Sequence, residues 1–228
     1  MASVPRGFPR TFPARSDGRR PWRYRVVSFL SRVALRLLFG RGLRFEGEAA
    51  FPRRGPLLVV SNHLSNIDPF IFGGFAPGTM FCMAKREIYA NRFVAWVMAG
   101  CNCFPVDRGA PDRWALRTTL NLLSSGGRVL IFVEGTRASG PGMKQAEPGI
   151  GFLARRSGAP VCPVAVWGTE RALQRGRRLP RRVQVTLRYG TPFEVELPEG
   201  RPDDQGIADD IARRIAELLP EEYRGVYA

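Results

Sequence analysis

The sequence has 228 residues, 44% of them hydrophobic and 24% charged, and its formal net charge is +15 at pH 7. This length and composition predict one globular domain with a short extension, and they exclude a wholly disordered chain. No apolar run reaches the roughly 18 residues of a conventional spanning helix, and the single histidine excludes any metal site that needs two histidines.

The positive charge is concentrated near the beginning of the chain. Residues 1–44 hold eleven arginines and one aspartate, a net charge of +10, which leaves +5 for residues 45–228. Residues 1–22, rich in Pro, Arg and Gly, are expected to form a flexible basic tail. Such an arm suits contact with nucleic acid or with an anionic membrane surface. Biased codon usage is the plainer explanation of its many arginines.

Residues 23–42 are predicted to contain an amphipathic helix, because apolar side chains recur at helical spacing up to Phe39. Its polar residues fall on the opposite side: Arg25, Ser28, Arg32 and Arg36. Two interpretations stay open. The helix either packs on the domain with its arginine face in water, or lies in a membrane interface with its arginines near lipid phosphates. A signal peptide is not expected, because arginines interrupt the apolar segment.

The remainder, residues 43–228, alternates between short β-branched runs and helical patterns, which predicts an α/β domain with a largely parallel or mixed sheet flanked by helices. The predicted strands are 57–60, 80–84, 102–106, 129–133, 161–166 and 183–188. The predicted helices are 68–75, 91–100, 113–124, 150–156 and 204–219. The four cysteines form no Cys-x-x-Cys pair and are expected to be reduced thiols, mostly filling the core.

A first polar cluster, Ser61-Asn62-His63-Leu64-Ser65-Asn66-Ile67-Asp68, follows the strand predicted at 57–60. A turn between His63 and Asp68 would let the two side chains meet, since on a regular helix they would point about 140° apart. A carboxylate on one imidazole nitrogen leaves the other free to accept a proton. Asp68 also suits a helix N-cap before Pro69. Because no Gly-x-Ser-x-Gly nucleophile is present, the pair indicates direct base catalysis.

Two further clusters offer cations at strand ends. Arg108 closes the segment that begins at Gly100, and it either binds an anionic substrate or forms a surface salt bridge. Glu134-Gly135-Thr136-Arg137 follows the strand predicted at 129–133. Gly135 permits a close ligand approach, Thr136 offers a hydroxyl, and the Arg137 fork suits phosphate oxygens, with Glu134 orienting it. Lys144, in a Gly-rich turn, adds a further cation.

Taken in order, these segments resemble the 1-acylglycerol-3-phosphate acyltransferase family of glycerolipid acyltransferases. The matching residues are Asn62, His63 and Asp68, then Gly100, Phe104 and Arg108, then Glu134 to Arg137, and finally Pro163 with Val164. The resemblance runs from about Phe45 to Gly168. Val133 and Ala138 depart from the usual Pro and Ser of the family, but neither change removes a charged group.

The resemblance implies transfer of a fatty acyl group from acyl-CoA or acyl carrier protein to the sn-2 hydroxyl of lysophosphatidate, giving phosphatidate, with no metal and no cofactor beyond the thioester. His63 would be the general base and Asp68 its partner. Arg137, Glu134, Gly135, Thr136, Arg108 and Lys144 would bind the phosphate. Backbone N–H groups near the helix at Asp68 are the candidate oxyanion donors. The lipid substrates favour a monotopic or peripheral protein on the cytoplasmic face of the cell membrane, bound to anionic lipids.

Three alternatives stay open. A protein of the same fold would use another acceptor, such as a different lysolipid, glycerol 3-phosphate or an amino-lipid. A nucleic-acid-binding protein would use the basic arm and the six arginines between Arg171 and Arg182, but stacking aromatics are missing there, so no nucleic acid partner is expected. A catalytically silent lipid-binding relative would not need the His63–Asp68 pair.

Overall fold

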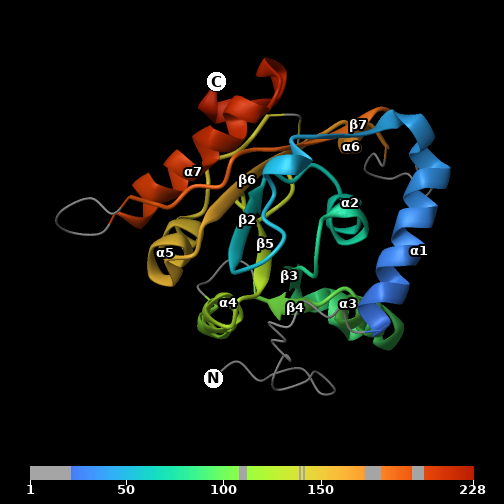
Figure 1. Ribbon diagram of the computed structural model, residues 1–228, viewed down its shortest axis with the longest axis horizontal. Helices are drawn as coiled ribbons and strands as arrows, with labels where there is room; N and C mark the ends of the chain where they lie inside the picture. The colour runs from blue at the N-terminus through green and yellow to red at the C-terminus, as the bar shows by residue number, and fades with distance from the viewer. Residues whose placement is uncertain (1–21, 108–111, 139, 141, 173–180, 197–202) are drawn as a thin grey trace.

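A seven-stranded sheet forms the centre of the computed structural model, which describes residues 22–107, 112–138, 140, 142–172, 181–196 and 203–228 (Figure 1). The strands are β1 (Leu43–Glu46), β2 (Leu57–Ser61), β3 (Phe81–Lys85), β4 (Cys103–Val106), β5 (Arg128–Phe132), β6 (Val161–Trp167) and β7 (Val185–Tyr189). Their order is β1-β7-β6-β2-β5-β3-β4, and only β6 and β7 pair antiparallel. The predicted mixed sheet flanked by helices is confirmed.

Helices cover both faces of this sheet (Figure 1). They are α1 (Trp22–Phe39), α2 (Asp68–Phe75), α3 (Arg92–Gly100), α4 (Arg113–Ser124), α5 (Pro148–Ser157), α6 (Thr169–Ala172) and α7 (Asp204–Leu218). Short 3-10 turns join them: η1 (Gly40–Gly42), η2 (Glu48–Ala50), η3 (Arg86–Ala90), η4 (Glu221–Tyr223) and η5 (Gly225–Tyr227). One core packs against α4, α5 and α7, and the other against α1 and α2. Side chains alternate between the two cores along each strand.

Two elements were not predicted, and both are short. β1 has four residues and is half-buried at the sheet edge, so it lacks a continuous apolar run. α6 is a single turn. β6 lies between β7 and β2, inside the sheet, although it contains Pro163 and proline is found mostly in edge strands. The Pro163 carbonyl still accepts from the Gly190 N–H at 2.8 Å.

Helix α1 packs on the domain through part of its polar side as well as through apolar residues. Its Ser28 hydroxyl donates to the Gly73 carbonyl at 2.6 Å, and the Arg32 guanidinium donates to the Gly74 carbonyl at 2.9 Å. These carbonyls belong to the last turn of α2, where helix carbonyls lack partners within the helix. Ser28 and Arg32 therefore face the protein, together with the buried side chains of Tyr24, Leu35 and Phe39, whereas Arg25 and Arg36 are exposed. A stripe of apolar side chains also faces outward: Trp22, Val26, Phe29, Leu30, Val33 and Leu37.

Among the described residues, no helix is both long and apolar enough to cross a bilayer. Helix α1 begins at Trp22 and ends at Phe39, close to the predicted bounds, and it contributes Leu35 and Phe39 to the core. Removing α1 would expose the apolar surface that Leu35 and Phe39 cover.

Candidate active site

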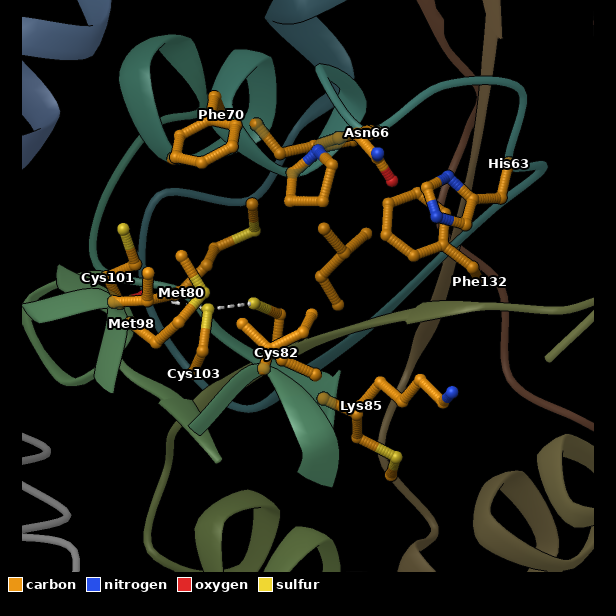
Figure 2. Close-up of a pocket in the computed structure, with 18 residues that line it drawn as sticks. His63, Asn66, Phe70, Met80, Cys82, Lys85, Met98, Cys101, Cys103 and Phe132 are labelled. Atoms are coloured by element: carbon orange, nitrogen blue, oxygen red, sulfur yellow. Dashed lines mark hydrogen bonds between the residues drawn. The ribbon is translucent and has the colours of Figure 1, made fainter. Parts of the chain in front are cut away.

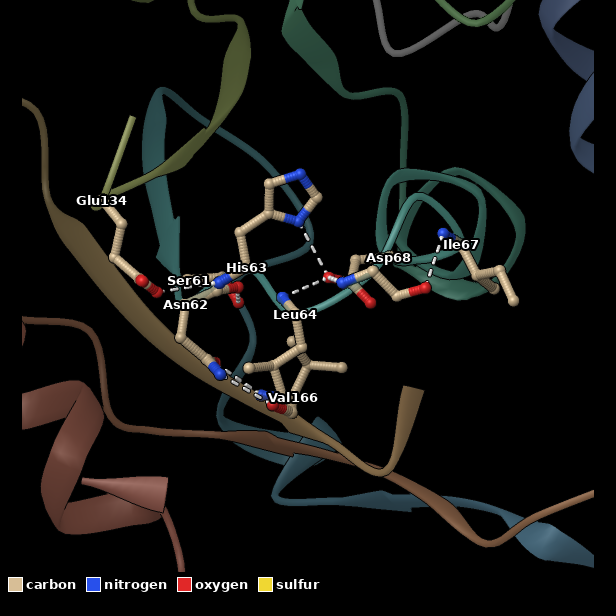
Figure 3. Close-up of polar contacts among 9 residues, drawn as sticks. Ser61, Asn62, His63, Leu64, Ile67, Asp68, Glu134 and Val166 are labelled. Atoms are coloured by element: carbon tan, nitrogen blue, oxygen red, sulfur yellow. Dashed lines mark hydrogen bonds and ion pairs between the residues drawn. The ribbon is translucent and has the colours of Figure 1, made fainter. Parts of the chain in front are cut away.

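His63 and Asp68 meet where the chain leaves β2 and enters α2 (Figure 3). The imidazole Nδ1 lies 2.8 Å from the Asp68 Oδ2, and both residues are buried. A carboxylate at this distance takes the proton of Nδ1 as a hydrogen bond, so Nε2 carries the lone pair. Nε2 points away from Asp68 (Figure 3). The turn that the sequence required between these two residues is present.

Asp68 has a different local role from the one its sequence position suggested. It is the first residue of α2, and Ile67 stands at the N-cap position without a side-chain cap. The same Oδ2 that faces His63 also accepts the backbone N–H groups of Leu64 and Ser65, each at 2.8 Å. These two N–H groups are therefore occupied and do not serve as the oxyanion donors that the sequence suggested. Their bonds instead fix the carboxylate against the loop.

Phe132 holds the imidazole ring, and Asn62 holds the backbone next to it. The His63 ring stacks on Phe132, the last residue of β5, with ring centroids 4.0 Å apart and planes 17° apart. Asn62 bonds to both backbone groups of Val166: Nδ2 donates to the carbonyl at 2.8 Å, and Oδ1 accepts from the N–H at 2.9 Å. The Asn62 side chain thus forms the pair of hydrogen bonds to β6 that a backbone peptide group of a neighbouring strand would form. The His63 side chain thus contacts α2 and β5, and its neighbour Asn62 is bonded to β6.

Glu134 lies directly behind this loop, and its contacts differ from those predicted. Its Oε1 accepts the His63 N–H at 3.1 Å and its Oε2 accepts the Lys144 N–H at 3.2 Å. The sequence placed Glu134 beside Arg137 in the phosphate-binding set. The structure shows a buried carboxylate that binds two backbone donors, which makes it a positioning residue. Burial raises the pKa of Glu134 to about 7, against the lowering effect of those two N–H groups and the Lys144 charge.

The segment after Glu134 turns back beside His63. Gly135 has a φ of +63°, and a Cβ there would lie 3.0 Å from the Glu147 side chain, so glycine suits this position. The Ala138 N–H donates to the His63 carbonyl at 2.9 Å. Thr136 is exposed and Arg137 is half-buried. The Arg137 guanidinium forms no hydrogen bond or ion pair with the described part of the chain, so it is available to an anion.

Lys144 lies on the same side, exposed, with its Nζ 3.5 Å from the Arg137 carbonyl. Arg108 lies outside the described residues. The structure thus brings three segments together at the loop after β2. They contribute His63 and Asp68, then Glu134, Gly135 and Arg137, and finally Lys144. Within the described chain, no group of three or more His, Cys, Asp or Glu residues is arranged to hold a metal ion.

An apolar cavity of about 310 Å³ begins at His63 and continues between the sheet, α2 and α3 (Figure 2). Its size falls at the lower end of ligand pockets, which are about 300–1,000 Å³. Its lining residues include Phe70, Met80, Cys82, Met98 and Phe132. The sequence did not identify this cavity, because thioether, thiol and aromatic side chains at helix and strand spacing are also typical of a core. Lys85, at the end of β3, adds a charge to the lining.

A second cavity, of about 500 Å³, lies along β5 and α5 and includes Gly135 and Thr136. Both cavities contact Leu130 and Phe132. β3 and β5 pair only through Phe81 with Val129 and Cys82 with Leu130. Beyond this point each strand pairs only with its other neighbour, up to Lys85 in β3 and Phe132 in β5. β3 and β5 therefore separate towards their C-terminal ends. The two cavities lie at this separation, since both contact Leu130 and Phe132 of β5.

The comparisons with known proteins agree with this geometry. The sequence profile of the Acyltransferase family matches residues 42–167, a span that includes both polar motifs. The chain is 29% identical over 161 residues to a 1-acyl-sn-glycerol-3-phosphate acyltransferase of Streptococcus pneumoniae, covering 69% of this chain and 57% of that protein. It is also 32% identical over 148 residues to a lyso-ornithine lipid O-acyltransferase of Pseudomonas aeruginosa, covering 64% of this chain and 55% of that protein.

A solved structure is also similar. The crystal structure of a 1-acyl-sn-glycerophosphate acyltransferase from Thermotoga maritima superposes with a TM-score of 0.69 and 26% sequence identity. The superposition covers 86% of this chain and 79% of that one. The chain thus spans most of the Thermotoga protein and somewhat more than half of the two relatives described above.

Proposed function

Because this chain belongs to the Acyltransferase family, we propose that it transfers a fatty acyl group from a thioester donor to the sn-2 hydroxyl of 1-acylglycerol 3-phosphate. The donor is acyl-CoA or acyl carrier protein, and the product is phosphatidate. The Streptococcus and Thermotoga relatives, both named as acyltransferases for this acceptor, support the choice of substrate.

The observation that carries the proposal is the His63–Asp68 pair at the entrance of an apolar cavity. In the proposed mechanism, Nε2 of His63 removes the proton from the acceptor hydroxyl as the oxygen attacks the thioester carbonyl. General-base assistance of this kind contributes roughly 10²–10⁴ in rate. Asp68 holds the tautomer with the proton on Nδ1 and stabilises the imidazolium as it forms.

The step balances without a covalent enzyme intermediate. A C–O bond forms to the sn-2 oxygen, the C–S bond breaks, and His63 returns its proton to the departing thiolate. The acyl chain of the donor would lie in the cavity that starts at His63, since about 310 Å³ of apolar space suits a hydrocarbon chain. No metal enters this step, because His63 itself moves the proton.

The acceptor phosphate would bind the Arg137 guanidinium, with help from Lys144, Thr136 and Arg108. Charge-assisted bonds from a planar guanidinium fork suit phosphate geometry. Arg137 precedes Ala138, whose N–H bonds to the His63 carbonyl, and the backbone N–H groups of Lys144 and His63 share the Glu134 carboxylate. A phosphate held by these cations would therefore keep the glycerol near the imidazole.

The test is thiol release from palmitoyl-CoA in the presence of lysophosphatidate, measured for the wild-type protein and for His63→Ala. We expect the variant to lose about 10²–10⁴-fold in turnover while its unfolding midpoint stays near that of the wild type. Equal turnover by the two proteins would refute the assigned base.

A related acceptor is the second candidate, since the Pseudomonas relative is named for lyso-ornithine lipid. That acceptor is an amino-lipid, and the Arg137–Lys144 pair would lack its phosphate partner. A panel of lysophosphatidate, lyso-ornithine lipid, other lysolipids and glycerol 3-phosphate, assayed at equal concentrations, separates these activities. A preference for a phosphate-free acceptor would contradict phosphate binding by Arg137 and Lys144.

We further propose that the protein is monotopic or peripheral on the cytoplasmic face of the cell membrane, with α1 lying in the interface. The outward stripe of α1 is apolar, and exposed Arg25 and Arg36 flank it where lipid phosphates would lie. Since α1 also packs on α2, point substitutions test this better than truncation. Leu30→Ser with Leu37→Ser should weaken binding to anionic vesicles, whereas Ala34→Ser on the same helix should not.

A further inference from the structure

Most exposed apolar side chains of the described residues belong to three elements of the chain. Among the described residues, ten large hydrophobic side chains are exposed, and nine of them lie on α1, η3 or α3. Six belong to the outward stripe of α1. The other three are Ile88 of η3 and Phe93 and Trp96 of α3. The tenth, Val226, lies near the C-terminus. This concentration exceeds the scattered exposure normal for a soluble surface.

Helix α3 carries two different apolar sides. Val94 and Met98 point inward and line the cavity that begins at His63 (Figure 2). Phe93 and Trp96 point outward, 72% and 45% exposed, with ring centroids 6.5 Å apart in a stacked arrangement. Ile88 belongs to both surfaces, since it lines the cavity and is 40% exposed. Ile88 therefore lies between the cavity and the protein surface.

Helix α3 also adjoins the first turns of α1 (Figure 1). The space for a Cβ at Gly100 is filled by the Val27 side chain at 2.9 Å, so the two helices touch at this point. The charge around them is mostly positive. α1 has no acidic residue, Arg92 at the start of α3 is exposed, and the exposed Glu87 is paired with Lys85 at 3.1 Å.

We propose that the η3–α3 corner, formed by Ile88, Phe93 and Trp96, is a second element that enters the interface of an anionic bilayer, in addition to α1. Indole rings favour the boundary between headgroups and acyl chains, and basic residues beside them add attraction to anionic lipids. With both elements inserted, the side of the cavity that Ile88 lines faces the lipid. The idea that lipid substrate or product enters the cavity from this side rests on the proposed function, whereas the bilayer contact does not.

Quenching of Trp96 fluorescence tests the contact directly. A variant with Trp22→Phe, Trp114→Phe and Trp167→Phe leaves Trp96 as the only indole. We expect vesicles of phosphatidylglycerol and phosphatidylcholine with brominated acyl chains to shift its emission to shorter wavelength and to quench it. Emission that stays unchanged while the protein sediments with the vesicles would overturn the proposal.

A matched pair of variants measures the energetic effect. Phe93→Ser should weaken partitioning onto the same vesicles about tenfold, since a large exposed side chain loses its burial. Val226→Ser, an equally exposed apolar position on another part of the surface, should leave partitioning unchanged. Equal partitioning by wild type and Phe93→Ser would overturn the proposal. A second outcome would also overturn it: the wild type forms a dimer without lipid, Phe93→Ser dissociates that dimer, and vesicles do not quench Trp96. The surface would then bind a second copy of the protein and not lipid.

Turnover measured without vesicles, on a short-chain lysophosphatidate that stays monomeric in water, separates this inference from the proposed function. Thiol release there by both wild type and Phe93→Ser, with weaker vesicle binding by the variant, is the expected result. If no acceptor supports thiol release and Trp96 is still quenched, the proposed function fails and the bilayer contact stands.

Discussion

The loop that carries His63 and the loop that carries Arg137 lie at the ends of neighbouring strands, yet the protein restrains them differently. In the first, the side chains of Asn62, His63 and Asp68 all have fixed protein partners. In the second, the backbone is fixed at Gly135 and Ala138, while the Arg137 guanidinium has no hydrogen-bond or ion-pair partner among the described residues. The difference suggests that the first loop sets the chemical step and the second adapts to the ligand.

The strongest way to break this comparison is Asp68→Asn. An asparagine oxygen in the place of Oδ2 can still accept from Leu64, Ser65 and Nδ1 of His63, because all three bonds go to that one atom. The substitution therefore removes the negative charge that stabilises the imidazolium as His63 accepts a proton. We expect kcat to fall by about 10²-fold or more with little change in KM for the acceptor. A change confined to KM would show that this loop binds and does not set the chemical step.

The complementary substitution is Arg137→Ala. Losing a charge-assisted bond to phosphate should lower kcat/KM for lysophosphatidate by about 10–100-fold, mainly through KM. Arg137→Lys should recover part of this loss, because it keeps the charge without the planar fork. Wild type and Arg137→Ala should use 1-acylglycerol, which lacks the phosphate, equally slowly. A loss of equal size on both acceptors would contradict phosphate binding.

The smallest expected effect concerns Glu134, which connects the two loops. Because burial raises its pKa to about 7 from a value of 4.5, the folded protein binds more protons than the unfolded chain between these pH values. The free energy of unfolding should therefore fall as pH rises through this window, by about 2 kcal/mol from this group. Urea unfolding at pH 5 and pH 8 measures the change.

Glu134→Gln is the control for that titration. The variant has no carboxyl at this position, so its stability should change less between pH 5 and pH 8 than that of the wild type. It should be less stable at pH 5, because one amide group would place a donor against the N–H of His63 or Lys144. Identical pH profiles for the two proteins would show that Glu134 does not titrate in this range.

The sequence predicted most of the fold because continuous apolar runs such as Leu57–Val60 identify buried strands, and glycine and proline mark their ends. It missed β1, where polar and apolar residues alternate over only four positions. It placed Asp68 beside His63 because the chemistry of a base requires that pairing. It misplaced Glu134, because the partners of that carboxylate are backbone N–H groups, which no pattern of side chains reveals.

The sequence pattern also could not predict the cavity or the orientation of α1, because each pattern fits two different structures. Helical periodicity separates the two sides of α1 but does not state which side meets the protein. The structure decides this through the glycine-containing end of α2, whose carbonyls accept from Ser28 and Arg32. An apolar residue such as Met98 likewise has the same pattern whether it fills a core or lines a cavity.

The Asn62 amide has a mechanical consequence. Since it joins Val166 by one donor and one acceptor, the reactive loop and the C-terminal end of β6 move as a single piece. β6 is paired to β7, and β7 to β1, so two strands remote from any proposed proton transfer share in holding the imidazole still. A shift in the register of those outer strands would be transmitted across the sheet to the proton acceptor, however far away the original disturbance lay.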